Sequence, residues 1–104
     1  MDKDFQEIDV QKVRQILEKG QATIVDVRDA AAYQQAHIEN AVLVNEENIN
    51  SFLEQVDKNK PLICYCYHGF SSQSAAGFFK SKGFSDVYSM RGGFEEWRKV
   101  FMES

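Results

Sequence analysis

The amino-acid sequence predicts an α/β fold in which helices cover both faces of a mostly parallel sheet. Short apolar segments of four or five residues alternate along the chain with longer segments of helical period. The most apolar segment, "LICYC" at 62–66, shows no polar alternation and is typical of a strand buried on both faces. Polar residues follow three of the predicted strands, and parallel strands bring such residues together at one edge of the sheet.

The first half of the chain contains two predicted helices and two predicted strands. Asp9 is a candidate N-cap of a helix that ends at Gly20, and the apolar face of this helix carries Val10, Val13, Ile16 and Leu17. The short β-branched segment 23–27 is predicted to be a strand. Asp29 can cap a short helix through "AAAYQQA", and "AVLV" at 41–44 is the next predicted strand.

The second half continues the alternation, with a helix at 49–56, a strand at 62–66, a helix at 71–83, a strand at 86–90 and a last helix marked by Phe94, Trp97 and Phe101. Pro61 marks a loop-to-strand junction. Ser71 and Ser72 are candidate caps of the helix that ends at Gly83. The pair Gly92–Gly93 interrupts the chain before the last helix.

Composition limits the classes of protein that the chain can belong to. Its 104 residues are expected to form one domain over 1–104, and 43% hydrophobic with 27% charged residues is typical of a globular protein. The net charge of −4 argues against nucleic-acid binding and against attraction to anionic lipid. The sequence contains no secretory leader and no apolar run that could span a membrane, so we expect a cytoplasmic protein with free thiols.

Cys66 is the main candidate for chemistry, because it ends the most apolar strand and a helix begins a few residues later. Gly69 lets the intervening loop adopt an unusual backbone, so that backbone N–H groups can surround the sulfur. The N-terminus of the following helix adds a positive partial charge. Both features favour a thiolate, the form of cysteine that acts as a nucleophile.

Other interpretations of the two cysteines are also possible on sequence alone. Cys66 could be a buried small hydrophobe, which is our interpretation of Cys64. A metal site built from Cys64, Cys66, His68 and His37 lacks the ligand spacing of known zinc sites, so no metal is expected. A phosphatase loop would need an arginine after the cysteine, and no basic residue occurs between Cys66 and Lys80.

Four segments, in order, resemble the rhodanese (sulfurtransferase) family, especially its single-domain members. The resemblance covers nearly the whole chain and rests on Asp26 and Arg28 in "IVDVRD", on His37, Ile38 and Ala41 in "AHIENAV", on the loop "CYHGFSS" and on Gly92, Gly93 and Trp97 in "GGFEEW". It implies a three-layer α/β/α domain with a five-strand parallel sheet. It also implies that the cysteine strand lies between the strands that end near Arg28 and Arg91.

The resemblance further implies a sulfurtransferase reaction without a cofactor. The Cys66 thiolate would take the sulfane sulfur of thiosulfate or a similar small donor, and the persulfide would pass it to cyanide, a thiol or a protein. The resemblance assigns persulfide binding to the loop residues Tyr67, His68, Gly69, Phe70, Ser71 and Ser72. The alternative is a persulfide carrier or binding module, which receives sulfur from a protein partner and turns over little thiosulfate.

The sequence departs from the family at one position near the loop. Many relatives carry a basic residue in or just after the loop, where this chain has Gln73. Arg28 and Arg91 are the candidate replacements for contact with an anionic donor, and we expect Arg91 to compensate in part. For Asp26, Arg28 and His37, however, a structural role is the simpler interpretation.

Overall fold

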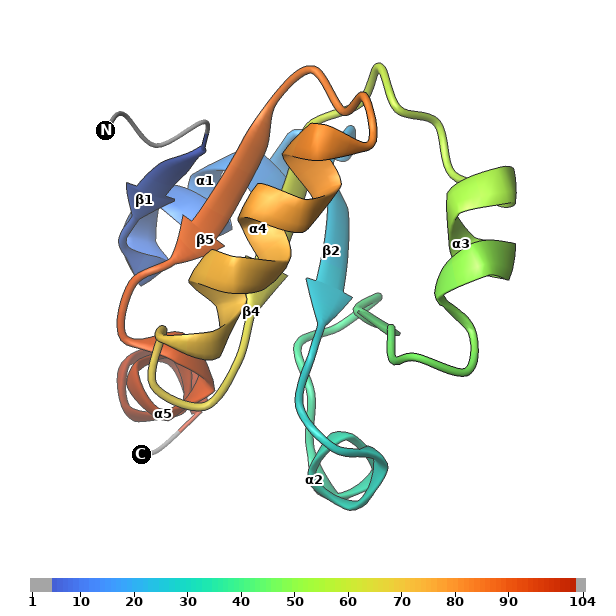
Figure 1. Ribbon diagram of the computed structural model, residues 1–104. Coiled ribbons are helices and arrows are strands. Elements are labelled where there is room, and N and C mark those ends of the chain that lie inside the picture. Colours follow the sequence, from blue (N-terminus) through green and yellow to red (C-terminus); the bar gives the residue numbers. More distant parts are fainter. Residues whose placement is uncertain (1–4, 103–104) are drawn as a thin grey trace.

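The computed structural model describes residues 5–102, in which five parallel strands form one sheet in the order β1-β5-β4-β2-β3 (Figure 1). The strands are β1 (Gln6–Ile8), β2 (Thr23–Asp26), β3 (Val42–Leu43), β4 (Leu62–Tyr65) and β5 (Val87–Met90). The central strand β4 pairs with β2 on one side and β5 on the other. The predicted α/β architecture and the predicted place of the cysteine strand are therefore confirmed.

Helices cover both faces of this sheet. They are α1 (Val10–Glu18), α2 (Ala30–Gln35), α3 (Ile49–Gln55), α4 (Ser71–Ser81) and α5 (Gly93–Trp97), which a π-helix at Arg98–Met102 continues. α4 crosses one face of the sheet, and α1 lies on the opposite face (Figure 1). The result is the three-layer α/β/α arrangement that the sequence predicts.

The two cores follow from the alternation of side chains along each strand. On β4, Ile63 and Tyr65 point into the core shared with α1 and α5, and Leu62 and Cys64 point into the core shared with α4. All four side chains of β4 are inaccessible to solvent. Burial on both faces explains why this strand lacks polar residues. Cys66 is the first residue after the strand and so lies at its carboxyl end.

Two details differ from the sequence prediction. Strand β1 was not predicted, because its sequence "QEI" is short and polar and pairs only with β5 at the sheet edge. Helix α4 has Phe70 at its N-cap without a side-chain cap bond, so the prediction that Ser71 and Ser72 cap this helix is wrong. The Ser72 side chain instead turns into the protein toward Cys66.

No helix within residues 5–102 is long and apolar enough to cross a membrane.

Candidate functional site

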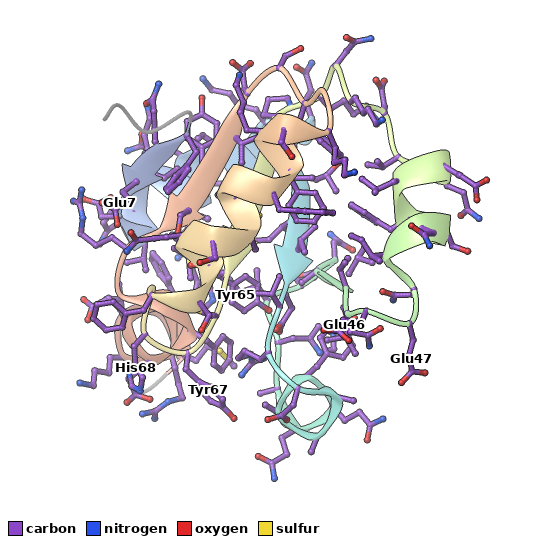
Figure 2. The ribbon with its side chains drawn as sticks, in the orientation of Figure 1. Glu7, Glu46, Glu47, Tyr65, Tyr67 and His68 are labelled. Atoms are coloured by element: carbon purple, nitrogen blue, oxygen red, sulfur yellow. The ribbon has the colours of Figure 1, made fainter. Side chains whose placement is uncertain are left out.

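The candidate site lies at the carboxyl edge of the sheet, where β4 ends and the loop to α4 begins. Figure 2 shows Tyr65 inside the fold and Tyr67 and His68 at the lower rim of the molecule, below the strands. Cys66 lies between Tyr65 and Tyr67 in the sequence and is only 5% exposed. The loop carries the nucleophile candidate from a buried strand to a point just beneath the surface.

Backbone amides converge on the Cys66 sulfur. The N–H groups of Gly69 and Ser72 each donate to Sγ at 3.2 Å. The Ser72 N–H belongs to the first turn of the eleven-residue helix α4, so the positive end of that helix also faces the sulfur. The predicted arrangement of loop amides and a helix N-terminus is therefore present.

These contacts change the acidity of the Cys66 thiol. Burial by itself raises the pKa, but hydrogen bonds from the Ser72 hydroxyl and from the N–H groups of Ser72, Gly69 and His68 outweigh it and lower the pKa overall. Cys64 differs, because complete burial and the nearby Cys66 raise its pKa. Of the two free cysteines, Cys66 is the one that favours the reactive thiolate.

The start of helix α5 holds the loop in this shape. Phe94 N–H donates to the Cys66 carbonyl at 2.7 Å, and Glu95 N–H donates to the Tyr67 carbonyl at 3.0 Å. These carbonyl oxygens are therefore turned toward α5, which leaves the next amides of the loop directed at the sulfur. Gly93 makes this contact possible, since a Cβ there would lie 2.4 Å from the Tyr67 oxygen.

Gly69 and Gln73 fix the crown of the loop. Gly69 has φ +93°, and a Cβ on it would lie 2.9 Å from the backbone nitrogen of Gly92. Gln73 Nε2 donates to the Gly69 carbonyl at 3.0 Å. The residue that replaces a basic side chain thus supports the loop backbone and supplies no charge.

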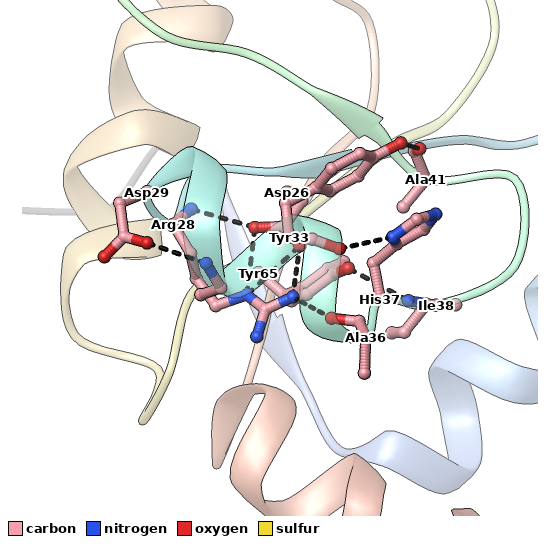
Figure 3. Close-up of polar contacts among 10 residues, drawn as sticks. Asp26, Arg28, Asp29, Tyr33, Ala36, His37, Ile38, Ala41 and Tyr65 are labelled. Atoms are coloured by element: carbon pink, nitrogen blue, oxygen red, sulfur yellow. Dashed lines mark hydrogen bonds and ion pairs between the residues drawn. The ribbon is translucent and has the colours of Figure 1, made fainter.

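Arg28 is held in a buried ion pair with Asp26 (Figure 3). Its Nε donates to both carboxylate oxygens at 3.1 Å, and Nη2 donates to Asp26 Oδ2 at 2.7 Å and to the Ala36 carbonyl at 2.6 Å. The guanidinium also lies 4.2 Å from the centre of the Phe94 ring. Burial tends to lower the pKa of Arg28, but the bond and the charge of Asp26 raise it overall, so the group stays charged.

The His-Ile-x-x-Ala segment forms a supporting network beside this pair (Figure 3). The His37 ring stacks on Tyr33 and its Nδ1 lies 2.7 Å from the Tyr33 carbonyl. Tyr33 Oη donates to the Ala41 carbonyl at 2.6 Å, and the Ile38 N–H donates to Tyr65 Oη at 3.1 Å. This network ties α2 to β4 and gives His37 the structural role that the sequence favours.

A pocket of about 310 Å³ opens above the sulfur. Its lining consists of Val27, Arg28, Asp29, Cys66, Tyr67, His68, Phe70 and Ser71. The pocket therefore combines Cys66 with four of the six predicted loop residues. The other two, Gly69 and Ser72, donate their N–H groups to the sulfur. Phe70 at its rim is 76% exposed.

The two candidate anion contacts have different surroundings. Arg28 lines the pocket, but its charge is matched by Asp26. Arg91 is not among the described residues that line the pocket, and its Nη2 lies 3.5 Å from the carbonyl oxygen of Glu7 on the edge strand. The sequence led us to expect that Arg91 supplies part of the positive charge that the loop lacks. The arrangement of the side chains does not support this expectation.

A metal site is the other alternative raised by the sequence. Within residues 5–102, no three His, Cys, Asp or Glu side chains gather in a way that could hold a metal ion. His37 is stacked on Tyr33, away from the pocket lining around Cys66.

Comparison with known proteins defines the class to which this fold and site belong. The family model of the rhodanese-like domain matches residues 9–100, and the chain belongs to the rhodanese family. It is 45% identical over 97 residues to the thiosulfate sulfurtransferase GlpE of Pseudomonas aeruginosa, covering 93% of this chain and 87% of that protein. GlpE of Vibrio cholerae is 41% identical over 96 residues, with coverage of 92% and 91%.

Solved structures support the same fold. A rhodanese-like domain protein from Staphylococcus aureus superposes with a TM-score of 0.78 at 24% identity, over 89% of this chain and 91% of that one. A human single-domain sulfurtransferase gives a TM-score of 0.79 at 20% identity, over 94% and 97% of the two chains. At this identity the likeness establishes the fold, and the chemistry must be argued from the residues.

Sequence analysis missed one residue of the site. Ser89 on β5 is inaccessible to solvent, and its Oγ lies 2.8 Å from the Oγ of Ser72. In the sequence, Ser89 is an ordinary residue of the apolar segment "DVYSM". A polar residue inside a strand that is buried on both faces was the available signal, because such a residue needs a hydrogen-bond partner.

Proposed function

We propose that the protein is a sulfurtransferase in which Cys66 carries the transferred sulfur as a persulfide. The observation that supports this most directly is the pair of N–H···S contacts, at 3.2 Å, between the sulfur and Gly69 and Ser72 at the base of an open pocket. The identity to GlpE sulfurtransferases over nearly the whole chain supports thiosulfate as a donor. The family match over residues 9–100 supports a single domain.

The proposed reaction has two steps, and Cys66 is the nucleophile in the first. Its thiolate attacks the outer sulfur of thiosulfate, the sulfur–sulfur bond of the donor breaks, and sulfite leaves with the bonding electron pair. The terminal sulfur of the resulting persulfide is then attacked by a thiol or by cyanide. This second step returns the electron pair to Cys66 and restores the thiolate.

The loop amides stabilise negative charge in both steps, because they are already oriented toward the sulfur before the reaction begins. Hydrogen bonds to a charged group contribute about 1.5–3 kcal/mol each. This stabilisation comes from backbone groups of the protein itself. The lowered pKa of Cys66 increases the fraction of protein in the attacking form near neutral pH.

A second candidate, a persulfide carrier loaded by a protein partner, is favoured by a specific observation. No lysine or arginine lies between Cys66 and Lys80, and the arginine in the pocket is already paired with Asp26. A dianionic donor would therefore meet amide dipoles and no unmatched cation. The exposed Phe70 at the rim offers an apolar contact to a protein that brings or receives sulfur.

The free thiols of both cysteines fit a reducing compartment such as the cytoplasm.

Intact mass after incubation with thiosulfate tests the proposal. Wild type and Cys64→Ser should each gain one sulfur atom, and Cys66→Ser should gain none. If wild type gains no sulfur from thiosulfate but gains it from a protein-bound persulfide, the carrier function replaces the thiosulfate reaction. If Cys66 accepts sulfur from neither and is alkylated as slowly as Cys64, the sulfurtransferase assignment is wrong.

A further inference from the structure

Ser89 connects strand β5 to the sulfur through one intervening hydroxyl. Ser72 and Ser89 are both inaccessible to solvent, and their Oγ atoms lie 2.8 Å apart. The Ser72 Oγ in turn lies 3.5 Å from Cys66 Sγ. A continuous chain of Sγ, Ser72 Oγ and Ser89 Oγ therefore runs from the nucleophile into the core.

The direction of the hydrogen bonds along this chain depends on the proton of Cys66. When Cys66 is a thiol, S–H donates to Ser72 Oγ, and the Ser72 hydroxyl donates to Ser89 Oγ. When the thiol proton has left to solvent, the sulfur can only accept, so the Ser72 hydroxyl must rotate and donate to it. In that state the Ser89 hydroxyl donates to the Ser72 Oγ. Ser89 can accept from Ser72 in the thiol state and donate to it in the thiolate state, because a hydroxyl both donates and accepts.

We propose that Ser89 is a positioning residue, which directs the Ser72 hydroxyl at the anionic sulfur of Cys66 and so stabilises the thiolate and the persulfide. This rests on the proposed function, since it concerns the same sulfur. The donation from Ser89 polarises the Ser72 hydroxyl and strengthens the bond that Ser72 makes to the anion. Without Ser89, the Ser72 hydroxyl loses this donor, and its bond to the anionic sulfur becomes weaker.

The ionisable groups around this chain do not provide the same contact. Glu7 on β1 and Cys64 on β4 are the register partners of Ser89 in the sheet. Burial raises the pKa of Cys64, which keeps it a neutral thiol. Other ionisable side chains near the loop are Arg91, two residues beyond Ser89, and those that line the pocket, namely Arg28, Asp29, Tyr67 and His68. Glu95 and Glu96 belong to α5, which packs against the loop.

The test is the pH dependence of Cys66 alkylation by iodoacetamide, with peptide mass mapping to separate Cys66 from Cys64. It requires no sulfur donor, so it is independent of whether thiosulfate is a substrate. Ser89→Ala should raise the pH midpoint by about half a unit, which is about a threefold loss of thiolate below the midpoint. Ser89→Thr keeps a hydroxyl and should stay near the wild-type midpoint.

Two further variants isolate the path through Ser72. Ser72→Ala should raise the midpoint more than Ser89→Ala, and the double variant should match Ser72→Ala alone, because Ser89 acts only through Ser72. Val87→Ala is the matched control, since Val87 is a buried residue on the same strand and the same side of the sheet. It should leave the midpoint unchanged.

The proposal fails if folded Ser89→Ala keeps the wild-type midpoint, or if the effects of the two single substitutions add in the double variant. It also fails if Val87→Ala moves the midpoint as much as Ser89→Ala, because the effect would then be one of general packing. If Ser89→Ala does not fold, Ser89→Cys replaces it, and the weaker thiol donor should shift the midpoint in the same direction. Normal midpoints in every variant overturn the role of Ser89 but not the persulfide reaction, which the mass measurement tests separately.

Discussion

Substitution of Gly93 by alanine should damage both stability and chemistry, since this glycine touches the back of the cysteine loop. The added Cβ would lie 2.4 Å from the Tyr67 oxygen and 2.6 Å from the Cys66 oxygen, in a residue with φ +62°. Real Cβ atoms do not approach backbone oxygen so closely, so the loop and α5 must separate. Separation would break the bonds from Phe94 N–H to Cys66 and from Glu95 N–H to Tyr67.

The magnitude follows from these two contributions. A left-handed backbone is unfavourable for alanine by about 1–2 kcal/mol, and each lost backbone hydrogen bond removes about 1 kcal/mol. The free energy of unfolding should therefore fall by about 3–4 kcal/mol, which a domain stable by about 5–15 kcal/mol can tolerate. Persulfide formation should slow at least about tenfold, because displacement of one amide from a charged sulfur forfeits about 1.5–3 kcal/mol.

Gly20→Ala is the matched control. Gly20 has φ +74°, and a Cβ there would meet no atom within 4 Å. Its substitution should lower the unfolding free energy by only the backbone contribution of about 1–2 kcal/mol and leave persulfide formation unchanged. Urea unfolding and the rate of mass gain from thiosulfate measure the two effects. Equal destabilisation of the two variants with a normal rate in Gly93→Ala would refute the role assigned to α5.

Three further predictions follow from the site. Asp26→Asn should lower the free energy of unfolding by about 3–5 kcal/mol in urea, because it leaves a buried guanidinium without its anion; a loss below about 1 kcal/mol, the range of exposed pairs, would contradict this. The free energy of unfolding of wild type, compared with that of Cys66→Ser, should increase with pH between the lowered pKa of folded Cys66 and the ordinary thiol pKa of about 8.5. The reason is that the folded state stabilises the thiolate, and this stabilisation is lost as pH falls through the folded pKa. A difference that does not change with pH would argue against the thiolate. Arg91→Ala should leave the thiosulfate concentration dependence of persulfide formation unchanged, because its guanidinium lies beside the Glu7 carbonyl; a large increase in the concentration needed would restore Arg91 as an anion contact.

The parts of the fold that sequence analysis predicted are those with a strong local signal. β4 is recognisable because burial on both faces requires an uninterrupted apolar run, and Cys66 follows it directly. Asp9 and Asp29 cap α1 and α2 as expected, by accepting from the backbone N–H groups of Lys12 and Ala32. In each case a few neighbouring residues determine the structure.

The features that could not be predicted depend on partners far away in the sequence. β1 is polar and is a strand only because β5 offers its edge. The sequence position of Ser72 is typical of a helix cap, but its hydroxyl points inward and forms hydrogen bonds with Cys66 and Ser89. The environment of Arg28 combines Asp26, Ala36 and the ring of Phe94, and its buried charge could not be inferred from the short motif alone.

The dependence of the cysteine loop on α5 has a consequence for how the protein folds. The amides that orient the loop belong to residues 94 and 95, and each lies 28 positions after the residue whose carbonyl it binds, Cys66 or Tyr67. Contacts between residues so far apart in the chain cost more conformational entropy than local contacts do. They are therefore expected to form after the local structure has formed. We therefore expect the reactive thiol to be assembled only when the last helix docks. During refolding, rapid alkylation specific to the native loop should appear after the helices have formed, which makes Cys66 a chemical reporter of completed folding.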